Sequence, residues 1–376
     1  MDRMGNLYGT VTYGGYARGC GGMGGCGEVF MLAKHASGWI FTPLYSFTGG
    51  NDGASPMAGV VIGPDGSLYG TNLAAGAGEC QYEGYPPGCG LVFSLKPAAH
   101  VSPSFLGRWT DNTLYAFHGQ SDGAYPMSSV VFDESGNLFG TASYMGEYGA
   151  GSVYELSPSQ DGWVAKVLYS FTGGSDGSSP TAGVIFDKSG NLYGTTSDGG
   201  AGSGKAGTVY ELVPAGGGWT ENVLHSFSYY GSDGGIPAGG LVMDASGNLY
   251  GATAAGYYGP TVFKLSPSER GWNFEVIYAL NGGEGPTASL TLDPAGNLYG
   301  TTVGEGAFGQ GNVFKLTQAN GGWTYTSLYD FTGGSDGRFP EGSVILDSSG
   351  NIYGTTSQAG SCGFGSGCGV VWEITP

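Results

Sequence analysis

One short motif recurs along the whole chain and limits what it can fold into. The motif is Gly190-Asn191-Leu192-Tyr193-Gly194-Thr195, and versions of it occur seven times. Its Asn position is held by Asn6, Ser67, Asn137, Asn191, Asn248, Asn297 and Asn351, so that neighbouring copies lie 49 to 70 residues apart. Repeats of this length are typical of propellers, solenoids and arrays, in which each unit buries its apolar face against the next.

Composition indicates that the repeated unit is made of β-strands. The 376 residues include 78 Gly and 18 Pro, spaced too closely for long helices. Such a Gly and Pro content would normally suggest disorder. Against disorder stand 18 Phe, 25 Tyr and 7 Trp, which recur at periodic positions. Ordered strands joined by glycine-rich loops account for both observations.

The repeat at 180–227 predicts four strands. A short apolar run at 182–187 is followed by an Asp-Lys-Ser-Gly-Asn turn, a motif that needs Gly at a positive φ. The second strand is expected at 192–196 and the third at 208–212, separated by a glycine-rich loop at 197–207. Trp219 begins a fourth strand that ends at Phe227. Four antiparallel strands per period describe the blade of a β-propeller.

Small residues at the start of each first strand favour a propeller over a sandwich. Only small side chains fit where innermost strands crowd together. The pairs are Ala58-Gly59, Ser128-Ser129, Ala182-Gly183, Gly239-Gly240, Ala288-Ser289 and Gly342-Ser343.

The strand count favours seven blades. The repeats predict six first, seven second, seven third and six fourth strands, which is 26 in all, two short of seven four-stranded blades. We therefore expect an all-β propeller forming one domain over 1–376, with six blades as the alternative. The expected blades are a partial first blade (1–49), full blades at 55–118, 124–172, 178–228, 235–281 and 285–332, and a partial last blade (339–376).

The two incomplete blades suggest that residues are missing before Met1. An upstream segment would supply an inner strand to the first blade and an outer strand to the last. The region Met1 to Gly9 aligns with Met243 to Gly251, so the first methionine stands where other repeats are finishing a strand. A signal peptide is accordingly expected to lie in the missing segment.

Four motif segments recur in a fixed order and resemble a known family. They are Pro-x-small-small-apolar, Asp-x-x-Gly-Asn-Leu-Tyr-Gly-Thr-Thr, Gly-x-Val-Phe-x-Leu, and Gly-Trp followed by Leu-Tyr-x-Phe-Thr-Gly-Gly-x-Asp-Gly. This pattern resembles the GloVer (Gloeo_Verruco) tandem repeat over essentially the whole chain. The resemblance implies an exported bacterial repeat protein and brings no catalytic residues with it. The chain departs from the usual export pattern, because it shows no signal peptide and no sorting tail after Pro376.

The charge excludes some partners. Thirty Asp and Glu against 12 Lys and Arg give a net charge of −18, which repels nucleic acid and anionic membranes. No apolar run approaches the roughly 20 residues of a membrane helix. An acidic surface tolerates cations and neutral polymers such as glycans. The same charge also serves simply to keep a β protein soluble.

Six cysteines form three local pairs: Cys20 with Cys26, Cys80 with Cys89, and Cys362 with Cys368. Each pair lies in the loop between a second and a third strand. Cysteine pairs in equivalent loops suggest disulfides, which are favoured outside the cytosol. Free structural thiols and a metal site are the alternatives, although no Cys-x-x-Cys pair or nearby His supports a metal.

Two sets of aspartates repeat. Those of the tight turn cap its backbone; they are Asp65, Asp133, Asp187, Asp244, Asp293 and Asp347. Those of the loop between repeats either stabilise that loop or hold calcium with loop carbonyls; they are Asp52, Asp122, Asp176, Asp233 and Asp336, with Glu284 at the related place in the fifth repeat. No catalytic set is visible, since none of the four histidines recurs in register.

Aromatic residues fall into a regular and an irregular set. The tryptophans that open the fourth strands are expected to pack between blades; they are Trp39, Trp109, Trp163, Trp219, Trp272 and Trp323. Irregular aromatics in the long loops are better ligand candidates, because loops on rigid scaffolds carry specificity. The candidates for binding are Tyr82, Tyr85, Tyr144, Tyr148, Tyr257 and Tyr258, with Tyr13, Tyr16, Phe308 and Phe364 of the same type.

Three classes of function follow. The preferred one is an extracytoplasmic, monomeric binding or scaffold propeller for a polysaccharide or protein at the cell surface. A propeller lyase or lactonase is the second, although such enzymes carry unique Glu, His or Asn residues that are not evident here. A passive surface spacer is the third. The fold alone does not separate them.

Overall fold

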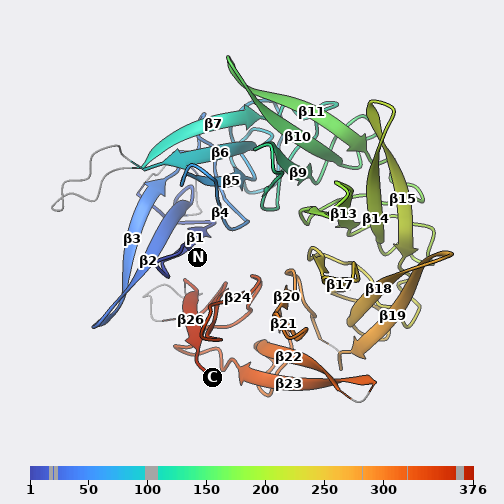
Figure 1. Cartoon of the computed structure of the whole chain (residues 1–376). Helices are drawn as coiled ribbons and strands as arrows, with labels where there is room; N and C mark the ends of the chain where they lie inside the picture. The colour runs from blue at the N-terminus through green and yellow to red at the C-terminus, as the bar shows by residue number, and fades with distance from the viewer. Residues whose placement is uncertain (17–19, 21–23, 98–108, 282, 320, 361–367) are drawn as a thin grey trace. The chain divides into compact units, whose positions relative to one another are not determined.

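The structure is a computed structural model that describes residues 1–16, 20, 24–97, 109–281, 283–319, 321–360 and 368–376. The described residues form 26 strands and no helix. These strands make seven antiparallel sheets, of which five have four strands and the first and last have three (Figure 1). The chain divides into two compact units.

The first unit comprises Met1–Thr172 and Ser179–Val184 and holds three sheets. The first sheet is β1 (Leu7–Val11), β2 (Glu28–His35) and β3 (Gly38–Ser46). The second is β4 (Val61–Ile62), β5 (Leu68–Asn72), β6 (Leu91–Lys96) and β7 (Thr110–Ala116). The third is β8 (Val131–Phe132), β9 (Leu138–Ala142), β10 (Ser152–Ser159) and β11 (Gly162–Ser170).

The second unit comprises Gly173–Ser178 and Ile185–Pro376 and holds four sheets. The fourth sheet is β12 (Ile185–Phe186), β13 (Leu192–Thr196), β14 (Thr208–Ala215) and β15 (Gly218–Ser226). The fifth is β16 (Val242–Met243), β17 (Leu249–Ala252), β18 (Thr261–Ser268) and β19 (Gly271–Ala279). The sixth is β20 (Thr291–Leu292), β21 (Leu298–Thr302), β22 (Asn312–Ala319) and β23 (Gly322–Asp330), and the seventh is β24 (Ile345–Leu346), β25 (Ile352–Thr356) and β26 (Val370–Ile374).

The fold class predicted from the sequence is confirmed. Each sheet is a simple meander with strands paired in sequence order, as in a propeller blade. The protein is an all-β, seven-bladed β-propeller, and the six-bladed alternative is wrong. That all seven blades form one domain stays a prediction.

The glycine of the repeated motif is explained by packing inside each sheet. A Cβ atom at Gly140 in β9 would collide with the ring of Tyr154 on β10, and one at Gly194 would collide with Tyr210. The same clash recurs at every copy of this glycine. The facing pairs are Gly9 and Phe30, Gly70 and Phe93, Gly251 and Phe263, Gly300 and Phe314, and Gly354 and Trp372. Each large third-strand ring therefore occupies the space that a side chain on the second strand would fill.

The threonine that follows this glycine ties one sheet to the next. Its hydroxyl donates to a backbone carbonyl in the small-residue segment before the next first strand. In the first unit Thr71 donates to the carbonyl of Ser128 over 2.8 Å. In the second unit Thr195 donates to Gly239 over 3.1 Å. The motif Gly-Thr thus fixes packing within a sheet and hydrogen bonding between sheets.

The first strands are shorter than expected, because only two residues of each form ladder pairs. The small residues lie just before them, where backbones of adjacent sheets come close. A Cβ at Gly183 would lie 2.8 Å from the carbonyl oxygen of Ser129, and one at Gly239 would collide with that of Ala288. The expectation that small side chains are required here is confirmed at these two positions.

Four of the six tryptophans that were predicted to pack between blades do so. Trp109 and Trp163 lie edge-on to Tyr8 and Tyr69 of the preceding sheet, with ring centroids 6.4 Å apart in both pairs. In the second unit Trp272 and Trp323 make the equivalent contacts with Tyr193 and Tyr250. The long hairpins of third and fourth strands that carry these tryptophans are labelled in Figure 1.

Candidate functional site

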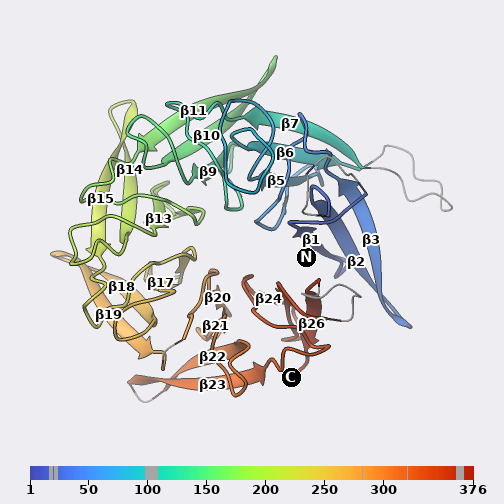
Figure 2. The same cartoon turned by 180° about the vertical axis from the view of Figure 1, so that it is seen from behind.

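Five tyrosines from four loops of the first unit come together, and we call them the first tyrosine cluster. They are Tyr13, which follows β1, Tyr82 and Tyr85 between β5 and β6, Tyr125 between β7 and β8, and Tyr144 after β9. In Figure 2 the loops next to β5 and β9 lie in front of their sheets. Loops far apart in the sequence thus build one aromatic surface.

The rings of the cluster form a continuous series of contacts. Tyr82 is its centre, with ring centroids 5.3 Å from Tyr85, 5.0 Å from Tyr125 and 6.2 Å from Tyr144, each edge to face. Tyr125 also lies edge to face with Tyr144, at 5.9 Å. Tyr13 reaches the series from the first sheet, with its hydroxyl oxygen 2.6 Å from that of Tyr85. The rings therefore pack as one connected group of edge-to-face contacts.

Exposure is graded across the cluster. Tyr125 is only 4% exposed, Tyr82 and Tyr85 are half-buried, and Tyr144 and Tyr13 are 39% and 44% exposed. Burial, followed by the hydrogen bond with Tyr13, raises the pKa of the Tyr85 hydroxyl. The Tyr85 phenol is therefore neutral at physiological pH. The cluster presents apolar faces with neutral hydroxyl groups.

A disulfide and a set of backbone hydrogen bonds hold the loops of the cluster in place. Cys80 is bonded to Cys89, so the segment carrying Tyr82 and Tyr85 is closed at both ends. The N–H of Tyr125 donates to the carbonyl of Cys89 over 2.8 Å. Ala124 and Tyr144 exchange two backbone bonds, of 2.7 and 3.1 Å. The loops that carry these rings are therefore joined by covalent and hydrogen bonds, an arrangement that would limit the loss of conformational entropy if a ligand bound here.

The structure brings together only some of the predicted ligand residues. Tyr82, Tyr85 and Tyr144 meet in the first cluster. Tyr257 and Tyr258 belong to the second unit, where their rings contact each other. Tyr148 is exposed and is not in ring contact with any described member of the first cluster. A role for each of them in binding stays a prediction.

Sequence reasoning missed Tyr125 as a ligand residue. It directly precedes Pro126, a place held in other repeats by Ser55, Ser179, Ile236 and Phe339. All of these residues have a positive φ, 59° for Tyr125, which is uncommon for bulky side chains. The sequence signal that could have identified Tyr125 is a large aromatic residue directly before the proline, at a position whose backbone conformation is the same in these repeats.

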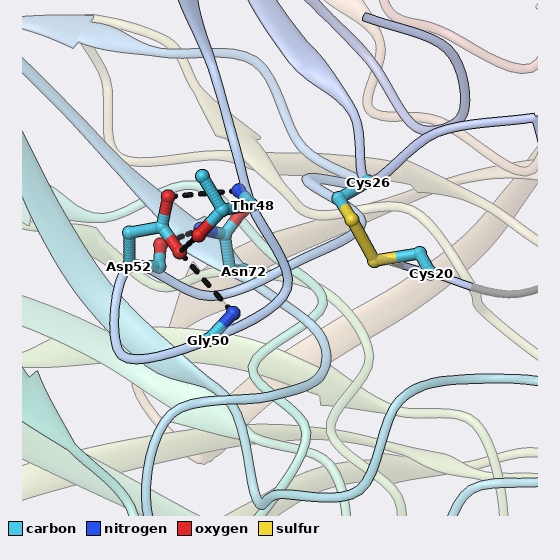
Figure 3. Close-up of a disulfide and its surroundings, with 6 residues drawn as sticks. All are labelled: Cys20, Cys26, Thr48, Gly50, Asp52 and Asn72. Carbon is cyan, nitrogen blue, oxygen red and sulfur yellow. Dashed lines mark hydrogen bonds between the residues drawn. A yellow bond between two sulfur atoms is a disulfide. The ribbon is translucent and has the colours of Figure 1, made fainter. Parts of the chain in front are cut away.

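The aspartates of the loops between sheets accept hydrogen bonds from their own loops. Asp52 accepts the N–H and the hydroxyl of Thr48 over 2.8 and 2.5 Å and the N–H of Gly50 over 3.3 Å (Figure 3). The hydroxyl of Tyr45 adds a bond of 3.1 Å. Asp336 repeats this arrangement with Thr332, Gly334 and Tyr329.

Other members of this aspartate set have similar partners. Asp122 accepts from Tyr115, His118 and Gln120, and Asp233 from His225 and Ser228, while Asp176 accepts the N–H of Gly174. Burial raises the pKa of Asp122, but the bonds from His118, Tyr115 and Gln120 outweigh it, so the pKa is lowered overall. Among the described residues, no three His, Cys, Asp or Glu side chains group as a metal site. Calcium at these aspartates stays a prediction.

The tight-turn aspartates cap their turns as expected. Asp187 accepts the N–H groups of Ser189 and Asn191 over 2.8 and 2.9 Å. Asp244, Asp293 and Asp347 accept equivalent bonds.

Two of the predicted disulfides are confirmed. Cys20 is bonded to Cys26, as Figure 3 shows, and Cys80 to Cys89. Cys362 and Phe364 lie outside the described residues, so the pairing of Cys362 with Cys368 stays a prediction.

Two fourth-strand carboxyl groups are unusual and were also missed. Asp111 and Glu221 occupy equivalent register positions, opposite Leu95 and Leu212, where other repeats carry residues such as Phe274 and Tyr325. Burial, and then the charge of Asp52, raise the pKa of Asp111 to about 7. Burial, and then the charge of Asp176, do the same for Glu221. The sequence signal that could have identified them is an acidic residue at a fourth-strand position that is aromatic in most other repeats.

Fold and site together define a β-propeller whose rigid loops display an aromatic surface. A sequence profile of the Gloeobacter/Verrucomicrobia repeat matches residues 79–282 and 257–376. The chain belongs to this family, so the resemblance noted from the motifs is confirmed. No curated protein matches the sequence.

Several solved structures share the fold at low sequence identity. A putative 6-phosphogluconolactonase from Bacteroides uniformis is 15% identical, with a TM-score of 0.55 over 93% of this chain and 88% of that one. One from Bacteroides fragilis is 16% identical, with a TM-score of 0.53 over 93% and 87%. A protein from Lactobacillus plantarum is 12% identical, with a TM-score of 0.54 over 93% and 89%. At these identities the likeness shows the fold alone.

Among the residues that the structure describes, none forms a helix that could cross a lipid bilayer.

Proposed function

We propose that this protein is an extracytoplasmic binding propeller that holds a neutral glycan on the first tyrosine cluster. The observation that carries the proposal is the series of ring contacts from Tyr13 through Tyr85 and Tyr82 to Tyr144. Sugar rings have apolar faces that stack on aromatic rings, and hydroxyl groups that bond to phenols. A partly exposed tyrosine surface on fixed loops offers both.

Charge supports a neutral ligand over an anionic one. With a net charge of −18, the protein repels anionic polymers at long range. Glu79 and Glu83 belong to the same loop as Tyr82, and Glu83 is exposed. An acidic glycan or a phosphorylated ligand would meet unfavourable charge beside the cluster.

Location outside the cytosol is supported by the disulfides. Two cysteine pairs are bonded, and disulfides persist mainly in oxidising compartments. Glycans of the cell envelope are accessible in the same compartments. A monomer that binds such a polymer at the cell surface is consistent with the proposal.

Affinity electrophoresis tests the proposal directly, because an acidic protein migrates well in native gels. The gels would contain hydroxyethylcellulose, mixed-linkage β-glucan, α-mannan or, as the anionic arm, polygalacturonate. We expect at least one neutral polysaccharide to retard the protein and polygalacturonate not to do so. The variant Y13A/Y144A should migrate faster than the intact protein in that neutral gel, while V164A, which shortens an exposed apolar side chain of β11 in the same unit, should not.

The proposal fails if no neutral polysaccharide retards the intact protein. Two outcomes would also point to another function. One is retardation by polygalacturonate alone. The other is hydrolysis of 6-phosphogluconolactone by both the intact protein and Y13A/Y144A with no retardation in any gel, which would favour the activity named for two of the similar structures.

A further inference from the structure

Four tyrosines of the second unit form a separate aromatic surface, which we call the second tyrosine cluster. They are two Tyr-Tyr dipeptides from neighbouring loops: Tyr229-Tyr230 between β15 and β16, and Tyr257-Tyr258 between β17 and β18. Ring centroids are 5.4 Å apart for Tyr229 and Tyr230, 6.1 Å for Tyr230 and Tyr257, and 5.1 Å for Tyr257 and Tyr258. We propose that this surface is a second glycan-binding site of the protein.

The first dipeptide departs from the repeat. Three counterparts read Phe47-Thr48-Gly49-Gly50-Asn51-Asp52, Phe171-Thr172-Gly173-Gly174-Ser175-Asp176 and Phe331-Thr332-Gly333-Gly334-Ser335-Asp336, whereas this loop reads Phe227-Ser228-Tyr229-Tyr230-Gly231-Ser232-Asp233 and is one residue longer. The aspartate still accepts the N–H of the residue after the Phe, here Ser228 over 3.2 Å. Shorter loops with two glycines make the same bond at Asp52 and Asp336, so the turn does not require two tyrosines.

Core packing does not account for these rings. Tyr230, Tyr257 and Tyr258 are 61%, 66% and 69% exposed. Three large aromatic side chains that contact one another and still face water form an exposed patch of the kind that marks a binding site. By contrast, Phe227 in the same loop is fully buried and serves the core.

The backbone under the second cluster is fixed. The N–H of Tyr257 donates to the carbonyl of Tyr229 over 2.7 Å, so the two loops are joined directly beneath the rings. Tyr229 in turn donates to the carbonyl of Ser203 over 2.8 Å. A Cβ at Gly204 would lie 2.8 Å from the Cβ of Tyr229 and 3.4 Å from the ring of Tyr230, so a third loop supports both residues.

The chemistry of the surface selects the ligand class. Phenol groups at exposed positions combine stacking faces with hydroxyl donors and acceptors, as neutral sugars require. The net charge of −18 opposes anionic polymers here too. The ligand class rests on the proposed function of the first cluster, while the existence of the second site rests on Tyr229, Tyr230, Tyr257 and Tyr258.

The test compares surface variants in the same polysaccharide gels. Y230A/Y257A removes the centre of the second cluster, and V223A is the control, because Val223 is an exposed apolar residue of β15 in the same unit. In the neutral polysaccharide that retards the intact protein, we expect Y230A/Y257A to bind about tenfold more weakly. V223A should bind like the intact protein. Y13A/Y144A should keep residual retardation, and the combined variant Y13A/Y144A/Y230A/Y257A should lose it.

Three other outcomes would overturn the inference, and each has a distinct signature. If Y230A/Y257A migrates like the intact protein while Y13A/Y144A loses all retardation, the first cluster binds alone and the proposed function stands. If light scattering shows a dimer that Y230A/Y257A converts to single chains, the surface joins two copies of this chain. If no neutral polysaccharide retards the intact protein, both proposals fail together. Unchanged thermal unfolding of Y230A/Y257A would show that lost binding is not lost folding.

Discussion

The hydroxyl oxygen of Tyr13 lies 2.6 Å from that of Tyr85, a hydrogen bond between residues 72 positions apart in the sequence. It links the loop after β1 to the loop between β5 and β6. We expect Y13F and Y85F each to lower the free energy of unfolding by about 0.5–1.5 kcal/mol. The double variant should lose less than the sum, because both changes remove the same bond. Urea unfolding of the four proteins measures this coupling, and strict additivity would show that the bond contributes nothing.

Removing the Cys80–Cys89 disulfide should weaken both stability and binding. The bridge closes a short loop, with a sequence separation of nine residues. We expect C80A/C89A to lower the free energy of unfolding by about 2–3 kcal/mol. Retardation in the neutral polysaccharide should also fall, because Tyr82 and Tyr85 are no longer held. Dithiothreitol should affect the intact protein but change the binding of C80A/C89A much less. Equal binding by the intact protein and C80A/C89A would contradict this role of the bridge.

Asp111 should make stability depend on pH. Its pKa in the folded protein is about 7, raised by burial and then by Asp52, from an ordinary value of 3.8. The folded protein therefore keeps this proton while the unfolded chain loses it, so stability falls as pH rises from about 4 to about 7. D111N has no such proton to lose. Relative to the intact protein, D111N should gain stability over this range, by on the order of 1 kcal/mol after allowing for solvent screening.

Thermal unfolding of the intact protein and D111N between pH 4 and 8 measures this gain. A constant difference between the two proteins across the range would mean that Asp111 titrates normally.

Asp122 distinguishes loop stabilisation from calcium binding. Its carboxylate accepts bonds from Tyr115, His118 and Gln120. We expect D122A to lower the free energy of unfolding by about 1–3 kcal/mol, with or without EGTA. If calcium raises the melting temperature of the intact protein but not of D122A, calcium binding at this loop is the correct interpretation instead.

Gly239 tests how tightly adjacent sheets approach. A Cβ atom there would collide with the backbone carbonyl of Ala288, which has little freedom to move. We expect G239A to lose about 1–3 kcal/mol of unfolding free energy. Gly59 belongs to the equivalent segment of the second repeat and has open space around its Cβ position, so G59A is the control. Equal melting temperatures for the two variants would contradict the close approach.

The regular features of the fold could be predicted from the sequence, because the motifs that produce them recur along the chain. The motif around Asn191 located the second strands, and the spacing of small residues located the contacts between sheets. The length of the first strands did not follow, because only Ile185 and Phe186 of the run at 182–187 find ladder partners. Apolar character alone does not reveal where hydrogen-bond pairing stops.

The candidate site was predicted less completely, because it depends on contacts between loops. Loop position alone identified Tyr82 and Tyr144, but their meeting through Tyr125 depends on a backbone turn that the sequence does not specify. Tyr229 and Tyr230 were missed for another reason. They lie in a loop that is one residue longer than its counterparts at 47–52 and 331–336, which carry two glycines, and a comparison of the repeats would have singled them out.

The lengthened loop that carries Tyr229 and Tyr230 has a consequence for how such proteins diversify. The strands, their bare glycines and the buried Phe227 are untouched by it, so a new surface is acquired without disturbing folding. Each repeat carries a comparable loop, and each is free to vary on its own. A lineage of these proteins could therefore change its surface one loop at a time. An engineer would do the same by exchanging a whole loop, because Gly173 and Gly333 have a positive φ that strains a tyrosine.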